Sequence, residues 1–237
     1  MTGFHDIRGA VFDTDWTILD SMGMWQDIDR RYLARFGKEA PADLQRRIEG
    51  FSVPETACYF KEAFGLPDST EEIIAAWNEM AREEYLYVLQ LKPGAEEYLR
   101  RLHEGGILLG IATTNYRDLT EACLRRLGIL DLFDAVVTSA EIEKGKPNPE
   151  IFLKAAQAMG LSPGDCIVFE DLPAGLLAGK RAGMKTVAVY DPAAAAVDAR
   201  KRAMADAYAA SWKEWMKETA GLLPESENDV SIQESEL

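Results

Sequence analysis

The chain has 237 residues, of which 47% are hydrophobic, and its formal net charge at pH 7 is −14. This length suits one domain with a sizeable insertion, or two modest domains. The acidity disfavours nucleic acids and anionic membranes as partners. It also opposes anionic ligands, so a site for such a ligand would need a bound cation and local basic residues.

The sequence shows neither a membrane segment nor a disulfide framework. No apolar run approaches the roughly 20 residues of a membrane span. Residues 1–6 lack the basic stretch and apolar run of a secretory signal, so we expect a cytoplasmic protein. Three cysteines, Cys58, Cys123 and Cys166, stand far apart among apolar neighbours. This spacing argues against disulfides and structural zinc, and it predicts buried thiols.

The first predicted element is a buried strand over residues 9–12. Only amphipathic helices follow between about residues 20 and 90. The first has an apolar face formed by Trp25, Ile28, Tyr32, Leu33 and Phe36. Ser52 with Glu55, and Ser69 with Glu72, have the spacing of capping boxes that open further helices. Residues 20–90 therefore form an inserted all-helical cap, which we expect to act as a lid.

The rest of the chain alternates between strand and helix patterns. Strands are predicted over 108–112, 135–138, 166–169 and 186–190, and the intervening helices end at Gly128, Gly160 and Gly183. Asn148-Pro149 predicts the start of the second of these helices. This alternation predicts an α/β fold, with a parallel sheet that helices cover on both faces, over residues 1–19 and 91–223.

The last part of the chain has a different composition. Trp212 and Trp215 predict a final helix that docks by an aromatic face. From Pro224 onward the sequence holds five acidic residues and no basic one, so we expect residues 224–237 to form a disordered tail.

Polar side chains follow each of the first four predicted strands. Ligands of open parallel sheets bind beyond the carboxyl ends of the strands, so these side chains are expected to meet at one edge. Both histidines, His5 and His103, lie elsewhere, which leaves a Ser-His or Cys-His triad without a base. The residues expected at this edge are Asp13, Asp15, Thr113, Thr114, Asn115, Lys146, Glu170 and Asp171.

Carboxylates clustered in this way cannot all stay ionised without a cation, and magnesium is the natural choice for hard oxygen ligands. Asp13 would then bind the metal and attack phosphorus to give an aspartyl-phosphate. Asp15 would protonate the leaving alcohol and later deprotonate water. Asp171 would complete the metal site. Glu170 would be either a water-mediated metal ligand or an anchor for Lys146.

The remaining residues of the edge have roles around the phosphoryl group. Thr113 and Lys146 would hold the phosphoryl oxygens, with Thr114 and Asn115 as further substrate-binding candidates. Each motif alone has a plainer explanation as a helix cap or turn. Their joint occurrence on successive strand ends favours phosphoryl chemistry.

These motifs resemble those of the haloacid dehalogenase superfamily, in the branch of phosphoglycolate phosphatases and β-phosphoglucomutases whose helical cap follows the first motif. The resemblance spans residues 7–190 and rests on DxDxT at 13–17, Thr113, GKPNPEIF at 145–152 and FEDLPAG at 169–175. It implies a Rossmann-like core, magnesium, Asp13 as nucleophile and Asp15 as acid/base. It also implies that Asp15 gives the metal its backbone carbonyl. Because dehalogenases of this group generally lack the second acid, its presence favours phosphate-ester chemistry.

One residue departs from the family pattern. The position between Asp15 and Thr17 is usually glycine in relatives, and here it is Trp16. Tryptophan does not adopt a positive φ cheaply. Its ring either packs beneath the cap hinge or forms a wall of the substrate site, and in the second case activity would be altered or impaired.

The predicted function is a magnesium-dependent phosphatase that hydrolyses a small phosphorylated metabolite. The first alternative is a sugar phosphomutase. Related mutases carry a cap arginine and a hinge histidine, and Val53 and Trp25 stand at the matching places. The second alternative is a non-catalytic phosphoacceptor or metal-binding switch. Cap residues Arg46, Arg47 and Ser52 are the candidates for substrate recognition.

Overall fold

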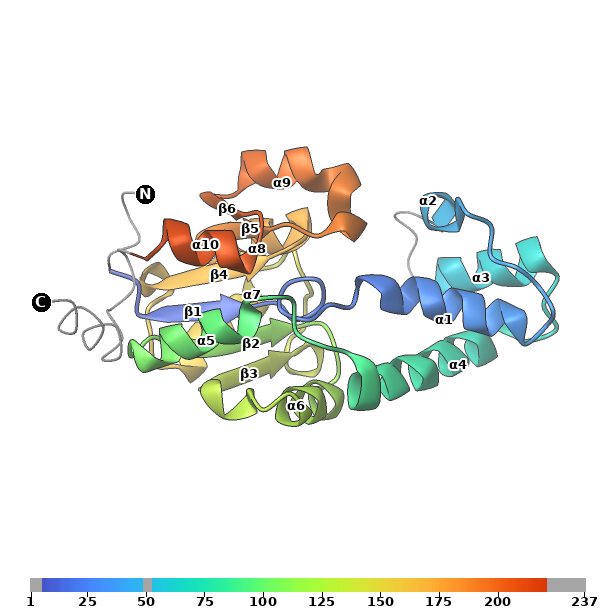
Figure 1. The fold of residues 1–237 in the computed structure, drawn as a ribbon, viewed down its shortest axis with the longest axis horizontal. Helices are drawn as coiled ribbons and strands as arrows, with labels where there is room; N and C mark the ends of the chain where they lie inside the picture. The colour runs from blue at the N-terminus through green and yellow to red at the C-terminus, as the bar shows by residue number, and fades with distance from the viewer. Residues whose placement is uncertain (1–5, 49–52, 221–237) are drawn as a thin grey trace, which may run out of the picture. The chain divides into compact units, whose positions relative to one another are not determined.

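The computed structural model describes residues 6–48 and 53–220, so Ser52 and the predicted tail over 224–237 lie outside the described residues. The chain divides into two compact units (Figure 1). One comprises Met1–Asp20 with Gln90–Leu237, and the other Ser21–Leu89. We call them the core unit and the helical unit and describe each by itself.

The core unit is built on a six-stranded parallel sheet in the order β3-β2-β1-β4-β5-β6. In chain order the strands are β1 (Gly9–Phe12), β2 (Leu108–Thr113), β3 (Ala135–Thr138), β4 (Cys166–Glu170), β5 (Lys185–Val189) and β6 (Ala207–Ala209). The five predicted strands are all present. The additional β6 has three residues, too few for a periodic pattern. The fold is therefore the predicted Rossmann-like α/β class with an all-helical insertion.

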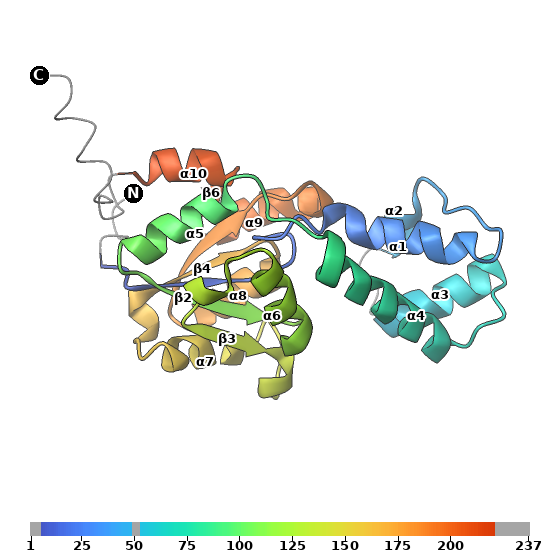
Figure 2. The ribbon, with the colours of Figure 1, turned by 60° about the horizontal axis from the view of Figure 1, so that its bottom comes forward.

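Helices cover both faces of the sheet (Figure 2). On one side lie α5 (Ala95–Glu104), α6 (Arg117–Arg126) and α10 (Trp212–Glu218), and on the other α7 (Glu150–Ala158) and α8 (Pro173–Arg181), with α9 (Asp198–Met204) beside α8. Four short turns connect them: η2 (Leu130–Leu132), η3 (Ser139–Glu141), η4 (Pro163–Asp165) and η5 (Pro192–Val197). The chain leaves α6, α7 and α8 through left-handed glycines, as predicted, with φ values of 71°, 68° and 81° at Gly128, Gly160 and Gly183.

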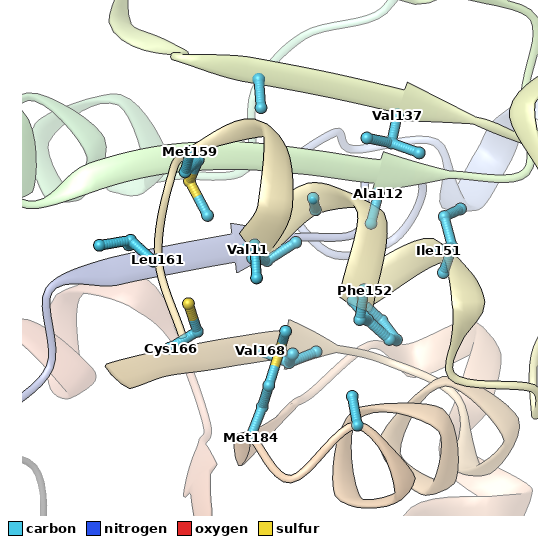
Figure 3. Packing of buried hydrophobic residues seen from close by; sticks show 14 of the residues in the cluster. Val11, Ala112, Val137, Ile151, Phe152, Met159, Leu161, Cys166, Val168 and Met184 are labelled. Carbon is cyan, nitrogen blue, oxygen red and sulfur yellow. The ribbon is translucent and has the colours of Figure 1, made fainter. Parts of the chain in front are cut away.

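Two apolar layers hold the sheet. Consecutive residues of a strand point to opposite faces, so Val11 and Phe12 serve different layers. Val11 packs with α7 residues such as Phe152 in the cluster of Figure 3. Phe12 stacks on Phe169 with ring centroids 4.8 Å apart and lies 6.0 Å from the ring of Trp212. The predicted aromatic docking of the last helix is confirmed.

The helical unit has a core of its own. Its elements are α1 (Met22–Ala34), α2 (Leu44–Ile48), α3 (Val53–Phe64), α4 (Thr70–Glu83) and the π-helical turn η1 (Glu84–Val88). The rings of Phe60 and Trp77 meet edge to face at 4.9 Å. Ser69 and Glu72 form the predicted capping box at the start of α4. Trp25, predicted on the apolar face of α1, is instead 38% exposed.

Two of the three cysteines are buried as predicted, namely Cys123 and Cys166. The prediction for Cys58 was wrong, because this residue is exposed on α3. Its apolar sequence neighbours point to other sides of the helix, and Ala57 and Phe60 are the buried residues there. None of the helices in the described ranges is long and apolar enough to cross a membrane.

The segments that leave and re-enter the core unit run side by side. Leu19 pairs with Leu91 in an antiparallel bridge, and the amide of Asp20 donates to the carbonyl of Gln90 at 2.8 Å. The returning segment is fixed by a buried ion pair, in which Lys92 Nζ lies 2.6 Å from Asp191 Oδ2. The insertion thus begins and ends at one place on the core unit.

Candidate active site

The loop after β1 carries Asp13 to the carboxyl edge of the sheet. The Asp13 amide donates to the carbonyl of Phe169 on β4 at 3.0 Å, which continues the ladder one residue beyond the strand. The amides of Ile18 and Leu19 both donate to the carbonyl of Thr14, at 3.1 and 2.9 Å. The chain therefore turns back at once, and the buried Asp13 side chain lies where β1 ends.

Lys146 reaches this carboxylate from the loop between η3 and α7. Its Nζ lies 2.6 Å from Asp13 Oδ1 and 2.6 Å from Glu170 Oε1, and it donates to the carbonyl of Ala112 at 3.1 Å. The ammonium also lies 5.3 Å from the centre of the Phe152 ring. Burial acts to lower the pKa of Lys146, but the carboxylates of Asp13 and Glu170 outweigh it and raise the pKa. Lys146 therefore stays charged and joins two carboxylates.

Both oxygens of Glu170 are engaged. Oε1 pairs with Lys146, while Oε2 accepts the backbone amides of Asp171 at 3.0 Å and Leu172 at 3.1 Å. Of the two roles considered for Glu170, this geometry corresponds to the anchor for Lys146.

Asp171 is a buried carboxylate that hydrogen bonds satisfy only in part. Thr17 Oγ1 donates to its Oδ1 at 3.2 Å, whereas its buried Oδ2 has no hydrogen-bond partner within the described part of the chain. Burial, with the nearby charges of Glu170 and Asp13, raises the pKa of Asp171 well above its usual value. A buried carboxylate oxygen left over in this way fits a cation ligand.

Burial and nearby charges also raise the pKa of Asp13, the proposed nucleophile. Burial raises the pKa of Asp13 from 3.8 to about 7, and the charges of Glu170 and Asp15 act in the same direction. Lys146 opposes this shift without cancelling it. The edge therefore holds more negative charge than its lysine neutralises.

The loop after β2 lies against the loop after β1. The hydroxyls of Thr14 and Thr113 are 2.7 Å apart, and Thr113 Oγ1 accepts the amide of Asn115 at 3.2 Å. Asn115 Nδ2 donates to Asp15 Oδ2 at 3.4 Å. Thr113 and Asn115 thus reach the Asp13–Asp15 loop, as expected.

The other predicted contact residues are placed differently. Thr114 is exposed, and its carbonyl accepts the hydroxyl of Ser139 at 2.9 Å. Arg47 belongs to the helical unit, where its Nε pairs with Asp43 Oδ1 at 2.9 Å. The Arg46 side chain and Ser52 lie outside what the structure describes.

Two site contacts were not anticipated. The Thr17 hydroxyl binds Asp171, and the Thr17 carbonyl accepts the indole N–H of Trp212 at 3.1 Å. Thr17 belongs to the DxDxT motif, so the sequence indicates that this residue lies in the site. The motif does not indicate that Thr17 contacts Asp171 and Trp212. No sequence pattern links Trp212 to it, because the two residues are far apart in the chain.

Comparison with known proteins identifies the family. The sequence of residues 10–189, from β1 to the end of β5, matches the family model of the haloacid dehalogenase-like hydrolases. The chain belongs to the haloacid dehalogenase-like hydrolases. The matched range includes residues 13–17, 113, 145–152 and 169–175, which carry the resemblance described in the sequence analysis.

Individual relatives of this haloacid dehalogenase-like protein resemble it over most of its length. It is 35% identical to the Drosophila melanogaster protein named "Probable pseudouridine-5'-phosphatase", over 78% of this chain and 83% of the relative. It is 32% identical to (DL)-glycerol-3-phosphatase 2 of Arabidopsis thaliana, over 94% of each chain. Among solved structures, a candidate beta-phosphoglucomutase from Thermotoga maritima superimposes with a TM-score of 0.78 at 28% identity, over 90% of this chain and 99% of the other.

Proposed function

We propose that this protein is a magnesium-dependent phosphatase that hydrolyses a small phosphorylated metabolite through an aspartyl-phosphate on Asp13. The observation that carries the proposal is the placement of Asp13 at the sheet edge, with Lys146 2.6 Å from its carboxylate and Glu170 holding that lysine. The phosphatase names of the similar proteins support the same conclusion.

The proposed reaction has two steps with balanced bonds. A carboxylate oxygen of Asp13 forms a bond to phosphorus while the bond from phosphorus to the ester oxygen breaks, and Asp15 gives its proton to the leaving alkoxide. Asp15 then takes a proton from water, whose oxygen attacks phosphorus and displaces the Asp13 carboxylate. Inorganic phosphate leaves, and both aspartates return to their starting states.

The other residues stabilise charge on the phosphoryl group. Lys146 and the hydroxyl of Thr113 are the donors we assign to its oxygens. The contact between Asn115 and Asp15 keeps the acid/base directed toward the same place. These groups are set by hydrogen bonds before substrate arrives, so little reorganisation accompanies the reaction.

The metal ligands that we propose are the carboxylates of Asp13 and Asp171 and the backbone carbonyl of Asp15. The buried, unsatisfied Oδ2 of Asp171 and the raised pKa of Asp13 both support a cation there. Among the described residues no three His, Cys, Asp or Glu side chains cluster as a metal site, and magnesium needs no such cluster because it usually keeps several waters. When bound, magnesium would neutralise charge on the phosphoryl oxygens.

The test is the release of inorganic phosphate from a panel of phosphate monoesters, with magnesium and with chelator. Asp13→Asn has the same shape but no nucleophilic carboxylate, so turnover should fall to background while the melting temperature stays near that of the wild type. Acid quenching of the wild type during turnover should trap phosphate on the protein. Retention of more than a small fraction of activity in Asp13→Asn would contradict the covalent mechanism.

The mutase alternative is separated by the products. Hexose 1-phosphates supplied with a catalytic amount of the corresponding bisphosphate should yield free phosphate faster than 6-phosphate. The reverse order of rates would make the protein a mutase.

A further inference from the structure

A glycine in α8 lies directly against the anchor of the catalytic lysine. A Cβ atom added at Gly175 would come 1.8 Å from Glu170 Oε1 and 1.9 Å from Glu170 Cδ. It would also lie 2.5 Å from Glu170 Oε2. These distances are far below van der Waals contact. The carboxylate of Glu170 therefore occupies the space that a side chain at residue 175 would need.

Glu170 cannot give way without losing a bond. Its Oε2 accepts the amides of Asp171 and Leu172, which precede α8, and its Oε1 is paired with Lys146. A methyl group at residue 175 must push the carboxylate off the amides, off the ammonium, or off both. Lys146 would then keep its contact with Asp13 without the opposing contact from Glu170 that holds it in place.

The other glycine of α8 has a different environment. A Cβ at Gly179 would lie 2.9 Å from Thr186 Cγ2 and 3.3 Å from Val168 Cβ, so it would meet only the apolar core. Glycine inside a helix is otherwise unfavourable relative to alanine. Gly179 is thus explained by close packing of helix on sheet, and Gly175 by the buried carboxylate.

We propose that Gly175 is a positioning residue for the reaction: its lack of a side chain lets Glu170 hold Lys146 2.6 Å from Asp13. This inference rests on the proposed function, because it assigns Gly175 a role through Lys146. It adds the first turn of α8 to the parts of the fold that set the geometry of the nucleophile.

The test is a double-mutant cycle on kcat with an aryl phosphate and saturating magnesium. Gly175→Ala should lower kcat by about tenfold or more, the scale of one displaced charge-assisted contact, with a smaller change in KM. Glu170→Ala should cause a similar loss. The double variant should be no slower than Glu170→Ala, because the truncated residue no longer meets the new methyl group. Multiplicative losses, or a Gly175→Ala enzyme with wild-type kcat, would overturn the proposal.

Melting temperatures provide a second readout that does not depend on turnover. In the wild-type protein, Gly175→Ala should lower the melting temperature. In the Glu170→Ala variant, the same substitution should leave the melting temperature unchanged or raise it, because alanine is the better helix former. Gly179→Ala, the matched control in the same helix, should lower the melting temperature in both backgrounds and change kcat by less than about threefold. Absence of phosphatase activity in the wild-type protein would refute the proposed function. If Gly175→Ala lowered the melting temperature both in the wild type and in the Glu170→Ala variant, the role of Gly175 would be refuted.

Discussion

At residue 16 the backbone has a φ of 60°, the only positive value at a non-glycine residue in the described part of the chain. Tryptophan disfavours such a φ, and Trp16 adopts it nonetheless. The left-handed conformation costs roughly 1–2 kcal/mol for a residue with a Cβ. Trp16 thus follows Asp15 in a turn whose backbone is strained for a residue with a side chain.

Trp16→Gly and Trp16→Ala separate this strain from the contacts of the ring. Both variants lose the indole, but only alanine keeps the Cβ. We therefore expect the free energy of unfolding of Trp16→Gly to exceed that of Trp16→Ala by about 1 kcal/mol. Urea denaturation in chelator measures the difference. Gly23→Ala, at a helical position in α1 with open space around it, should show the opposite preference for alanine. Equal stability of the two Trp16 variants would mean that the loop relaxes out of the positive φ.

A second prediction at the scale of single residues concerns Asp15, the proposed acid/base. Asp15→Asn keeps the shape of the side chain but has no acidic proton to donate, so formation of the aspartyl-phosphate should slow by about 10²–10⁴-fold with alkyl phosphates, whose alkoxides leave poorly. Aryl phosphates, whose phenolates leave without a proton, should lose much less in this step. Hydrolysis of the aspartyl-phosphate, in which Asp15 accepts a proton from water, should slow alike for both esters. Rapid-quench measurement of phosphate bound to the protein in the first turnover, on a matched alkyl and aryl pair, separates the two steps. Equal losses on both esters in the first step would count against Asp15 as the acid.

Among the elements, the amino end of β5 is held by one carboxylate. Asp206 Oδ2 accepts both the amide and the hydroxyl of Thr186 at 2.9 Å, and Oδ1 pairs with Lys180 of α8 at 3.1 Å. Partial burial acts to raise the pKa of Asp206, but the bonds from Lys180 and Thr186 outweigh it and lower the pKa. This carboxylate thus ties β5, α8 and the start of β6.

The pH dependence of stability follows from the direction of that shift. Because the folded state favours the ionised form of Asp206, the stabilisation is complete above the ordinary pKa of 3.8 and is lost as the pH falls through the lower native value. Asp206→Asn should therefore cost about 1–2 kcal/mol at pH 7, and the difference from the wild type should shrink below about pH 4. Denaturation curves at several pH values test this. Asp131→Asn, at an exposed position in η2, is the control that should change little.

The sequence predicted elements better than contacts between them. Strands β1 to β5 were found because each is a short, continuous apolar run bounded by turn residues. Because the strands are parallel, their carboxyl ends meet at one edge of the sheet, so the sequence alone predicts that Asp13, Lys146 and Asp171 lie close together. In contrast, the space at Gly175 and the hydrogen bond from Trp212 to Thr17 depend on packing between distant segments, and no local pattern encodes them.

The same limit explains two wrong expectations in the helical unit. Cys58 and Trp25 each stand near apolar residues, yet both are exposed. An amphipathic helix buries a stripe whose width depends on its neighbours, and a residue at the margin of the stripe is assigned correctly only when those neighbours are known.

For the whole molecule, the adjacent ends of the insertion predict that the core unit can fold without it. The paired Leu19 and Leu91, with Asp20 bonded to Gln90, already form the base of a hairpin. Replacing Ser21–Leu89 by Asn-Gly, which favours a two-residue hairpin turn, should leave a chain with an α/β circular dichroism spectrum and a cooperative melting transition. A variant with a longer Gly-Ser linker is the control for turn strain. Loss of cooperative melting in both would show that the core unit needs the insertion to fold.

The bond between Trp212 and Thr17 also bears on the order in which the protein is made. Asp13 leaves the ribosome early in synthesis, Lys146 and Asp171 follow much later, and Trp212, the first residue of α10, follows later still. Until that last helix emerges, the nascent chain has neither the indole N–H for the Thr17 carbonyl nor the aromatic cover for Phe12 and Phe169. Domains generally fold as units during synthesis. The loop over residues 13–17 is therefore completed only after nearly all of the described sequence has been translated.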